Sequence, residues 1–282
     1  MQKHALAVHD VSCFGRCSLT VALPILSAAG VHTSVIPTAL LSTHTGEFTG
    51  YTHLDLSDQL LPIAAHLSTL GLHFDAFYSG YLASGKQAAQ ILAIMDLLCG
   101  KETQVFVDPA FADHGKLYSH MDADMPLQMR RLCERANVII PNFTEASFLL
   151  GRAYRPHGYD TAYVQTLAAE LAALGPQSVV ITDVHIEPGQ TSVAVYQKET
   201  ESFRLLSKEE FSGVFHGTGD IFASFLIACL LNGLPLNEAA QTALDCTHDA
   251  IRLTIAGGEP LRFGVRFELV LPQLLDRLRM AE

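Results

Sequence analysis

Short apolar runs alternate along the chain with segments whose apolar residues recur at helical spacing. The runs at 4–9 (HALAVH) and 31–37 (VHTSVIP) predict strands. The segment between them, SLTVALPILSAAG, has the apolar spacing of a helix and ends in glycine. The first 37 residues therefore predict a strand, a helix and a second strand.

The same alternation continues towards the middle of the chain, with a helix predicted at about 84–98. Further strands are predicted at 74–79, 103–108, 137–140 and 178–182. Strands that are apolar throughout and separated by helices are typical of a parallel sheet covered on both faces.

The last third of the chain has a different pattern. Two β-like stretches within 191–207 predict an antiparallel pair at one edge of the sheet. Strongly apolar helices are predicted at about 218–232 and 236–255, separated by the sequence NGLP.

Length and composition favour one large unit. The chain has 282 residues, 49% of them hydrophobic, which is enough to bury a substantial core. We find no internal repeat and no low-complexity linker, so we expect 1–282 to form a single α/β domain. It would have three layers, with a mostly parallel central sheet flanked by helices and a small edge or lid element near residues 38–54.

Charge and hydropathy exclude several classes of partner. No apolar stretch approaches the length needed to cross a bilayer, and the start MQKHALAVHD lacks the features of a signal peptide, so we expect a cytoplasmic protein. The formal net charge is −11 and no Lys/Arg cluster occurs, which argues against nucleic acid. An anionic ligand would need local attraction from a metal ion, a helix N-terminus or a cation such as Lys116.

Polar residues follow the predicted strands, at the positions where ligands collect in open parallel sheets. These residues are Asp10, 79–81, 108–113, 142–145, Thr182 and Asp183. We therefore expect the ligand site at this edge of the sheet.

The segment FHGTGDIFASFLIACLL places Gly217, Thr218, Gly219 and Asp220 at the start of a long apolar helix. Free backbone N–H groups and the positive end of the helix dipole suit a phosphoryl group there. Asp220 is placed to accept a proton from an alcohol that attacks phosphorus. The helix start favours the ionised carboxylate, whereas burial raises its pKa. The alternative is that Asp220 merely complements the dipole and the glycines merely turn the chain.

Together with further motifs, this segment resembles the pyridoxal kinase branch of the ribokinase-like superfamily. The motifs are GTGD at 217–220, VDPAFADHGKLY at 107–118, PNFTE at 141–145, SGYL at 79–82 and STHTG at 42–46. The resemblance implies a ribokinase-like fold and direct in-line transfer of the γ-phosphoryl group of ATP. The acceptor would be the hydroxymethyl group of a B6 vitamer: pyridoxamine, pyridoxine or pyridoxal.

The resemblance also implies roles for individual residues. Asp220 would be the catalytic base, with the amides of Gly217, Thr218 and Gly219 forming an anion hole. ATP and Mg²⁺ would be bound by a second group of residues, of which the metal would use the carboxylates of Asp108 and Glu145. That second group consists of Asp108, Asp113, Asn142, Glu145 and Thr182. A monovalent cation and a homodimer are further expectations.

On the vitamin side, the corresponding positions are Asp10, Thr45, His44 and Tyr81. Pyridoxal kinases usually carry serine at the position of Asp10. A carboxylate there favours a cationic or donating group, so we expect a preference for pyridoxamine or pyridoxine. The family also often has threonine where this chain has Ile140, which removes one contact to the nucleotide.

Several other signals are weaker. GYLASGKQ imitates a phosphate-binding loop but ends in Gln87 instead of Ser or Thr, and the histidines lack metal-ligand spacing. The nearest rival is a hydroxymethylpyrimidine kinase of the same superfamily, whose members carry an aspartate at the position of Asp10. A protein that binds a vitamin or nucleotide without catalysis is the alternative from another class.

Overall fold

The computed structural model describes residues 2–119 and 121–280. The strands are β1 (His4–Ser12), β2 (His32–Leu41), β3 (His53–Asp55), β4 (Ala76–Ser79), β5 (Gln104–Val107), β6 (Ala112–Asp113), β7 (Lys116–Leu117), β8 (Val138–Ile139), β9 (Ser178–Val184), β10 (Gln190–Gln197) and β11 (Ser202–Glu209). The α-helices are α1 (Leu19–Ala28), α2 (Ser57–Ser68), α3 (Gly85–Leu98), α4 (Met125–Cys133), α5 (Phe143–Leu149), α6 (Thr161–Ala173), α7 (Thr218–Leu231), α8 (Leu236–Gly257) and α9 (Leu271–Arg279).

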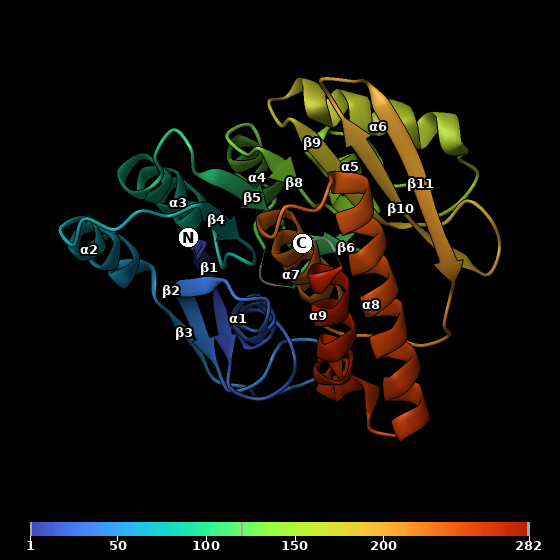
Figure 1. Cartoon of the computed structure of the whole chain (residues 1–282), viewed down its shortest axis with the longest axis horizontal. Coiled ribbons are helices and arrows are strands. Elements are labelled where there is room, and N and C mark those ends of the chain that lie inside the picture. Colours follow the sequence, from blue (N-terminus) through green and yellow to red (C-terminus); the bar gives the residue numbers. More distant parts are fainter. Residues whose placement is uncertain (1, 120, 281–282) are drawn as a thin grey trace.

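A nine-stranded sheet runs through the centre of the molecule in the order β11-β10-β9-β8-β5-β4-β1-β2-β3 (Figure 1). The six strands from β9 to β2 pair in parallel, whereas β3 at one edge and β10 and β11 at the other pair antiparallel. This confirms the predicted α/β fold with a mostly parallel sheet and an antiparallel pair at one edge.

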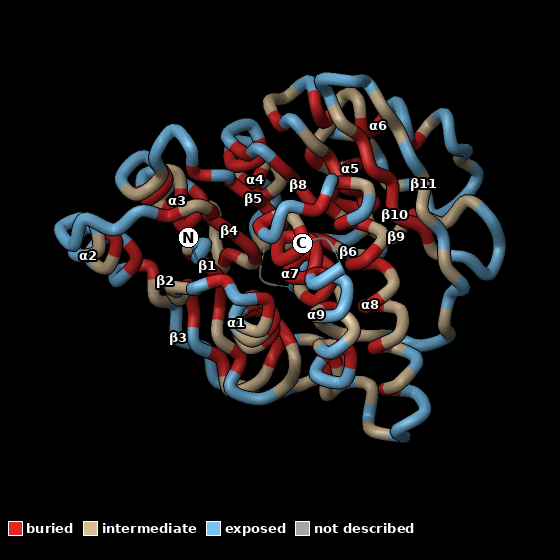
Figure 2. The backbone as a smooth tube through the Cα atoms, viewed as in Figure 1, coloured by how far each residue is buried: buried red, intermediate tan, exposed pale blue. Residues whose placement is uncertain are grey.

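Each face of the sheet carries its own layer of helices and its own apolar core. In β1, Ala5 and Ala7 belong to the core under α1, α7, α8 and α9, whereas Leu6 and Val8 belong to the core under α2 to α6. This alternation is expected for a strand buried on both faces. Figure 2 shows the buried residues concentrated along the strands and the inner sides of the helices.

The predicted elements agree with the structure to within a few residues, but several strands run further than expected. Asp10 lies inside β1 instead of after it, because pairing with β2 resumes beyond an irregularity between His9 and Val11. Thr182 likewise lies inside β9, which pairs with β10 as far as Val184. The predicted edge element is also real: β2 continues to Leu41, and β3 pairs with it after a connecting segment.

The order of the strands creates a place for a ligand. The chain places β2 on one side of β1 and later adds β4 on the other side, so the direction of winding reverses between β1 and β4. In open α/β sheets, ligands bind outside the carboxyl ends of the strands at such a switch point. Asp10 in β1 and Tyr81 just after β4 both come from this region.

None of the helices in the described part of the chain is both long enough and apolar enough to cross a bilayer.

Candidate active site

Gly217 precedes α7 in a conformation that glycine adopts readily. Its φ is 77°, and a Cβ atom at this position would overlap the carbonyl oxygen of Arg16. At Gly219, by contrast, an added Cβ would meet no atom within 4 Å. The loop around Arg16 therefore packs closely against the start of the helix, while open space lies in front of Gly219. The first N–H groups of any helix lack intrahelical acceptors and are available to an anion.

Asp220 lies in the first turn of α7, with its side chain 15% exposed. Its Oδ2 atom accepts a hydrogen bond of 2.8 Å from the backbone N–H of Ser18, a residue held at a positive φ of 53°. Burial raises the pKa of Asp220 to about 7, against the opposing effect of the Ser18 N–H and with a further increase from the charge of Asp10. Burial thus outweighs the hydrogen bond from Ser18, and the group can exchange a proton near neutral pH.

Asp10 is a charged neighbour of this aspartate, and Tyr81 is in turn a neighbour of Asp10. Asp10 is only 4% exposed, and its Oδ2 atom accepts a hydrogen bond from the hydroxyl of Ser12. Burial raises its pKa to about 6. The pKa of Tyr81 is raised to about 12 by burial and then by the charge of Asp10. The structure therefore brings Asp10 and Tyr81 into electrostatic contact with each other, and Asp10 with Asp220.

The other two predicted substrate residues lie in the segment between β2 and β3. Thr45 is exposed, whereas His44 is 8% exposed. The Nδ1 atom of His44 accepts from the N–H of Gly46 at 3.1 Å, so its Nε2–H donates to the carbonyl of Arg262 at 2.8 Å. Its ring lies 5.0 Å from that of His216, the residue before Gly217. His44 thus ties this segment to the loop before α7.

Three of the residues predicted for the nucleotide side, Asn142, Glu145 and Thr182, lie together at the start of α5. The Oε1 atom of Glu145 accepts from the N–H groups of Phe111 and Ala112 at 2.8 and 3.3 Å, and Oε2 accepts from the N–H of Asn142 at 2.9 Å. Asn142 accepts in return from the N–H of Glu145 at 2.9 Å, which completes a capping box. A β-bridge joins Asn142 to Thr182.

Acidic groups accumulate beside this cap. The pKa of Asp108 is raised well above its ordinary value by burial and then by the charges of Glu145 and Asp220. Burial also raises the pKa of Glu145 to about 8, although its three backbone donors oppose the rise. The pKa of Asp113 is raised too, mainly by burial, and its Oδ2 atom lies 3.6 Å from Nε2 of His114.

These carboxylates fit the requirements of a magnesium ion. Among the described residues, neither Asp108 nor Glu145 forms an ion pair with a lysine or arginine. Mg²⁺ prefers oxygen ligands and keeps several of its waters. Both oxygens of Glu145 already accept backbone N–H groups, so this carboxylate suits an ion held through water. Ile140 is 3% exposed and packs in the core.

Two residues of the site escaped sequence reasoning. Ser18 contributes only its backbone N–H, so its side chain gives no signal. His9 lies 4.0 Å from Asp220 and is fully buried. The alternation along β1 could have revealed it, because His9 follows Ala5 and Ala7 on the face that packs under α7.

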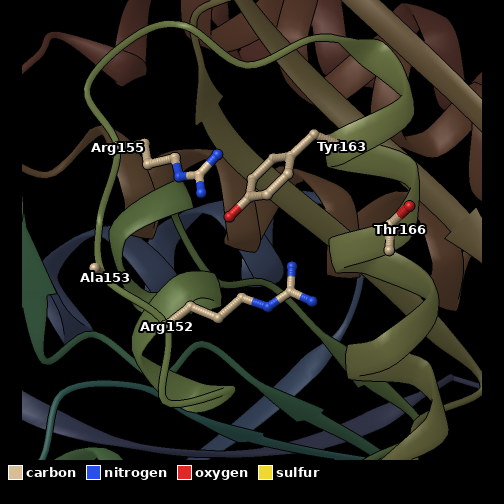
Figure 3. Close-up of a pocket in the computed structure, with 5 residues that line it drawn as sticks. All are labelled: Arg152, Ala153, Arg155, Tyr163 and Thr166. Atoms are coloured by element: carbon tan, nitrogen blue, oxygen red, sulfur yellow. The ribbon is translucent and has the colours of Figure 1, made fainter.

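A hollow of about 440 Å³ lies elsewhere, lined by Arg152, Ala153, Arg155, Tyr163 and Thr166. Figure 3 shows both arginines beside the ring of Tyr163, which lies 5.7 and 5.2 Å from their guanidinium carbons. These residues belong to α6 and the segment before it. None of them is a candidate site residue, and Asp220 does not line the hollow.

Comparisons with known proteins find similarity to kinases of small molecules, both of pyrimidines and of pyridoxal. The model of the family described as phosphomethylpyrimidine kinase matches residues 23–262. A hydroxymethylpyrimidine/phosphomethylpyrimidine kinase from Rhizobium meliloti is 27% identical over 259 residues, covering 90% of this chain and 94% of its own length.

Two solved structures resemble the chain over nearly its whole length. A putative phosphomethylpyrimidine kinase from Bacteroides thetaiotaomicron, crystallised with pyridoxal, is 34% identical with a TM-score of 0.91, covering 99% of this chain and 96% of its own. The pyridoxal kinase from Lactobacillus plantarum is 31% identical with a TM-score of 0.90, covering 99% of both chains.

Proposed function

This chain belongs to the phosphomethylpyrimidine kinase family, and we propose that it transfers the γ-phosphoryl group of ATP to the hydroxymethyl group of a B6 vitamer. The observation that carries the proposal is the position of Asp220, a partly exposed carboxylate at the start of α7, beside the switch point of the sheet. Its pKa of about 7 suits a group that must take up a proton and release it again at neutral pH.

In the proposed reaction the substrate hydroxyl oxygen attacks the γ-phosphorus in line with the leaving ADP oxygen. A bond forms between the hydroxyl oxygen and phosphorus while the bond to ADP breaks, and Asp220 takes the hydroxyl proton. The amides of Gly217, Thr218 and Gly219 stabilise the charge on the transferred group. No phosphoenzyme is formed.

The nucleotide phosphates would lie beside α5. Asp108 and Glu145 would hold Mg²⁺ there, and a bound Mg²⁺ would neutralise charge on the phosphate oxygens. Asp113, Asn142 and Thr182 would complete this side of the site. Because Glu145 already fixes the backbone at Phe111 and Ala112, it keeps the loop after β5 in place as well.

The vitamin would lie between Asp10, Thr45 and Tyr81, with His44 holding the covering segment. That segment would exclude water, which could otherwise accept the phosphoryl group. Two observations favour a B6 vitamer: the relative that is 34% identical was crystallised with pyridoxal, and the one that is 31% identical is named a pyridoxal kinase.

Two alternatives remain as outcomes of the test. A hydroxymethylpyrimidine kinase is favoured by the family description and by the relative from Rhizobium meliloti. A binding protein without activity would keep the pocket and lose the chemistry. The raised pKa of Asp220 argues against this alternative.

The test is a coupled assay of ADP release with pyridoxal, pyridoxine, pyridoxamine and hydroxymethylpyrimidine. We expect a B6 vitamer to be phosphorylated with a higher kcat/KM than the pyrimidine. A higher kcat/KM with hydroxymethylpyrimidine would overturn the choice of substrate, and a lack of ADP release with all four alcohols would overturn the kinase assignment.

The remaining proposals concern the whole molecule. We propose that residues 1–282 form one kinase domain, that two copies form a homodimer in the cytoplasm, and that a monovalent cation assists turnover. Light scattering tests the dimer, and cell fractionation tests the cytoplasmic location. Assays with Na⁺ or K⁺ as the sole monovalent cation test the need for such an ion.

A further inference from the structure

His9 occupies an unusual position for a histidine. It lies in β1 with no exposed surface, on the face of the strand that packs under α7. Its Nδ1 atom lies 4.0 Å from Oδ1 of Asp220, and its ring meets the edge of Tyr78 at 4.7 Å. A polar ring is thus enclosed beside the proposed catalytic base.

The ring nitrogens of His9 have no hydrogen-bond partner among the described residues. A buried polar atom without a partner is costly, so such atoms in folded proteins usually have a role. Burial lowers the pKa of His9 to about 3, which keeps the imidazole neutral. A neutral imidazole carries one N–H donor and one acceptor nitrogen.

Gly80 makes room for this ring. A Cβ atom at Gly80 would overlap Cε1 and Nε2 of His9, so even alanine would force the ring to move. The N–H of Gly80 is bonded to the carbonyl of Val8 at 3.1 Å, which fixes this backbone against β1. The glycine of the SGYL motif therefore supports the placement of His9.

Asp220 has an oxygen available for this neighbour. Its Oδ2 atom is used by the N–H of Ser18, whereas Oδ1 faces His9. Each carboxylate oxygen has two lone pairs, so Oδ1 can accept from an imidazole and still receive the substrate proton. The separation must shorten by about 1 Å to form a direct hydrogen bond, and at 4.0 Å an ionised Asp220 already favours the proton on the nitrogen that faces it.

We propose that His9 is a positioning residue that donates its Nδ1–H to Asp220 and, together with the Ser18 N–H, holds the carboxylate towards the substrate hydroxyl. This inference rests on the proposed function and deepens it. The donor also favours the ionised carboxylate, which is the form that accepts a proton.

Other titratable groups face Asp220 from the neighbouring elements. They are Asp10, Cys17, Tyr78, Asp108 and Tyr118. Each of these groups, when ionised, favours the protonated form of Asp220, so His9 acts in the opposite sense.

The first test measures the tautomer of His9 and needs no activity. Long-range ¹H–¹⁵N spectra of the full chain at pH 8.5, with the His9 signals assigned by their loss in His9→Phe, report which nitrogen carries the proton. We expect the proton on Nδ1 in the wild type and a loss of that preference in Asp220→Ala. A proton on Nε2 in the wild type, or an unchanged tautomer in Asp220→Ala, would overturn the proposal even if the kinase assay succeeds.

The second test is kinetic. His9→Phe keeps a ring but removes the donor, so kcat should fall by about tenfold or more, as expected for a lost hydrogen bond to a charged group. The acid limb of the pH profile of kcat/KM should move to higher pH, because the pKa of Asp220 rises without the donor. The KM for ATP should stay within about twofold, since the ring of His9 forms no hydrogen bond with a proposed nucleotide-side residue in the described part of the chain.

Two amide variants provide a matched control. The side-chain nitrogen of asparagine can occupy the position of Nδ1, whereas that of glutamine reaches the position of Nε2. His9→Asn should therefore recover more of kcat than His9→Gln. Wild-type kcat and an unshifted pH profile in His9→Phe, or equal losses in the two amide variants, would contradict a positioning role.

Gly80 offers an independent check that does not depend on folding of His9→Phe. Gly80→Ala should lower kcat by displacing the ring, but should cost little further activity in a His9→Ala protein, where the ring is absent. Additive losses in the double variant would contradict the proposed coupling.

Discussion

Asp220→Asn is expected to stabilise the free protein while it abolishes catalysis. The folded protein raises the pKa of Asp220 from 3.8 to about 7, chiefly through burial. A raised carboxyl pKa means that the group favours the fold when protonated. That contribution is fully present below pH 3.8 and is lost as the pH rises through 7. The shift of roughly three units corresponds to about 4 kcal/mol, because each unit is worth about 1.4 kcal/mol.

Asparagine has nearly the same shape, keeps an oxygen for the N–H of Ser18 and has no charge to lose. The free energy of unfolding of Asp220→Asn relative to wild type should therefore rise by about 2.5 kcal/mol between pH 5 and pH 8. Urea titrations followed by far-UV circular dichroism measure it, since the chain contains no tryptophan. Asp276→Asn is the control: that carboxylate is 75% exposed, and its variant should stay within about 0.5 kcal/mol of wild type at both pH values.

Two results would contradict this prediction: an equal stability advantage of Asp220→Asn at pH 5 and pH 8, or a variant that is less stable than wild type at pH 8. Either result would mean that burial does not raise the pKa of this carboxyl. A stability advantage of Asp220→Asn that increases from pH 5 to pH 8 would instead identify Asp220 as a group whose charge destabilises the fold, as is common for catalytic residues.

Four further variants test other parts of the site. Gly217→Ala should lose activity and about 1–3 kcal/mol of stability from backbone strain. Gly219→Ala should keep its urea midpoint but lose kcat by about tenfold or more, because its methyl group faces the open space at the helix start. Equal urea midpoints in the two variants would refute this contrast. Asp10→Asn should raise pyridoxal turnover relative to pyridoxamine turnover, and an unchanged ratio of the two kcat/KM values would count against a role of the carboxylate in selecting the amine. Glu145→Gln should lower the free energy of unfolding by about 1–3 kcal/mol, since an amide cannot satisfy all three backbone donors. It should also raise the KM for ATP, and a wild-type KM would contradict a role of Glu145 on the nucleotide side.

The fold could be predicted from the sequence because the strands are buried on both faces. Their continuous apolar runs gave strand positions within a few residues, and the start of α7 coincides with the predicted one at Thr218. Helix α2 was missed because it is largely exposed, with only Ser57, Leu60 and Ala64 buried. In the GYLASGKQ segment, Gln87 is buried and donates to the carbonyl of Thr38, while Lys86 is exposed.

The site was harder to predict because much of it depends on backbone atoms and on contacts between distant segments. The N–H of Ser18 meets Asp220 across 202 residues, and no side-chain pattern encodes that contact. Glu145 is predicted to hold a metal, but no sequence pattern indicates that it also accepts N–H groups from Phe111 and Ala112. The role of Gly80 becomes visible only when the ring of His9 is placed beside it.

The most direct test of the central claim is phosphoryl transfer from ATP labelled at the γ-position to a B6 vitamer by wild type and Asp220→Asn. We expect the variant to bind ATP with a Kd within a few-fold of wild type and to transfer the label at a rate lower by about a hundredfold or more, as for loss of a general base. Transfer at the wild-type rate by Asp220→Asn would contradict the account.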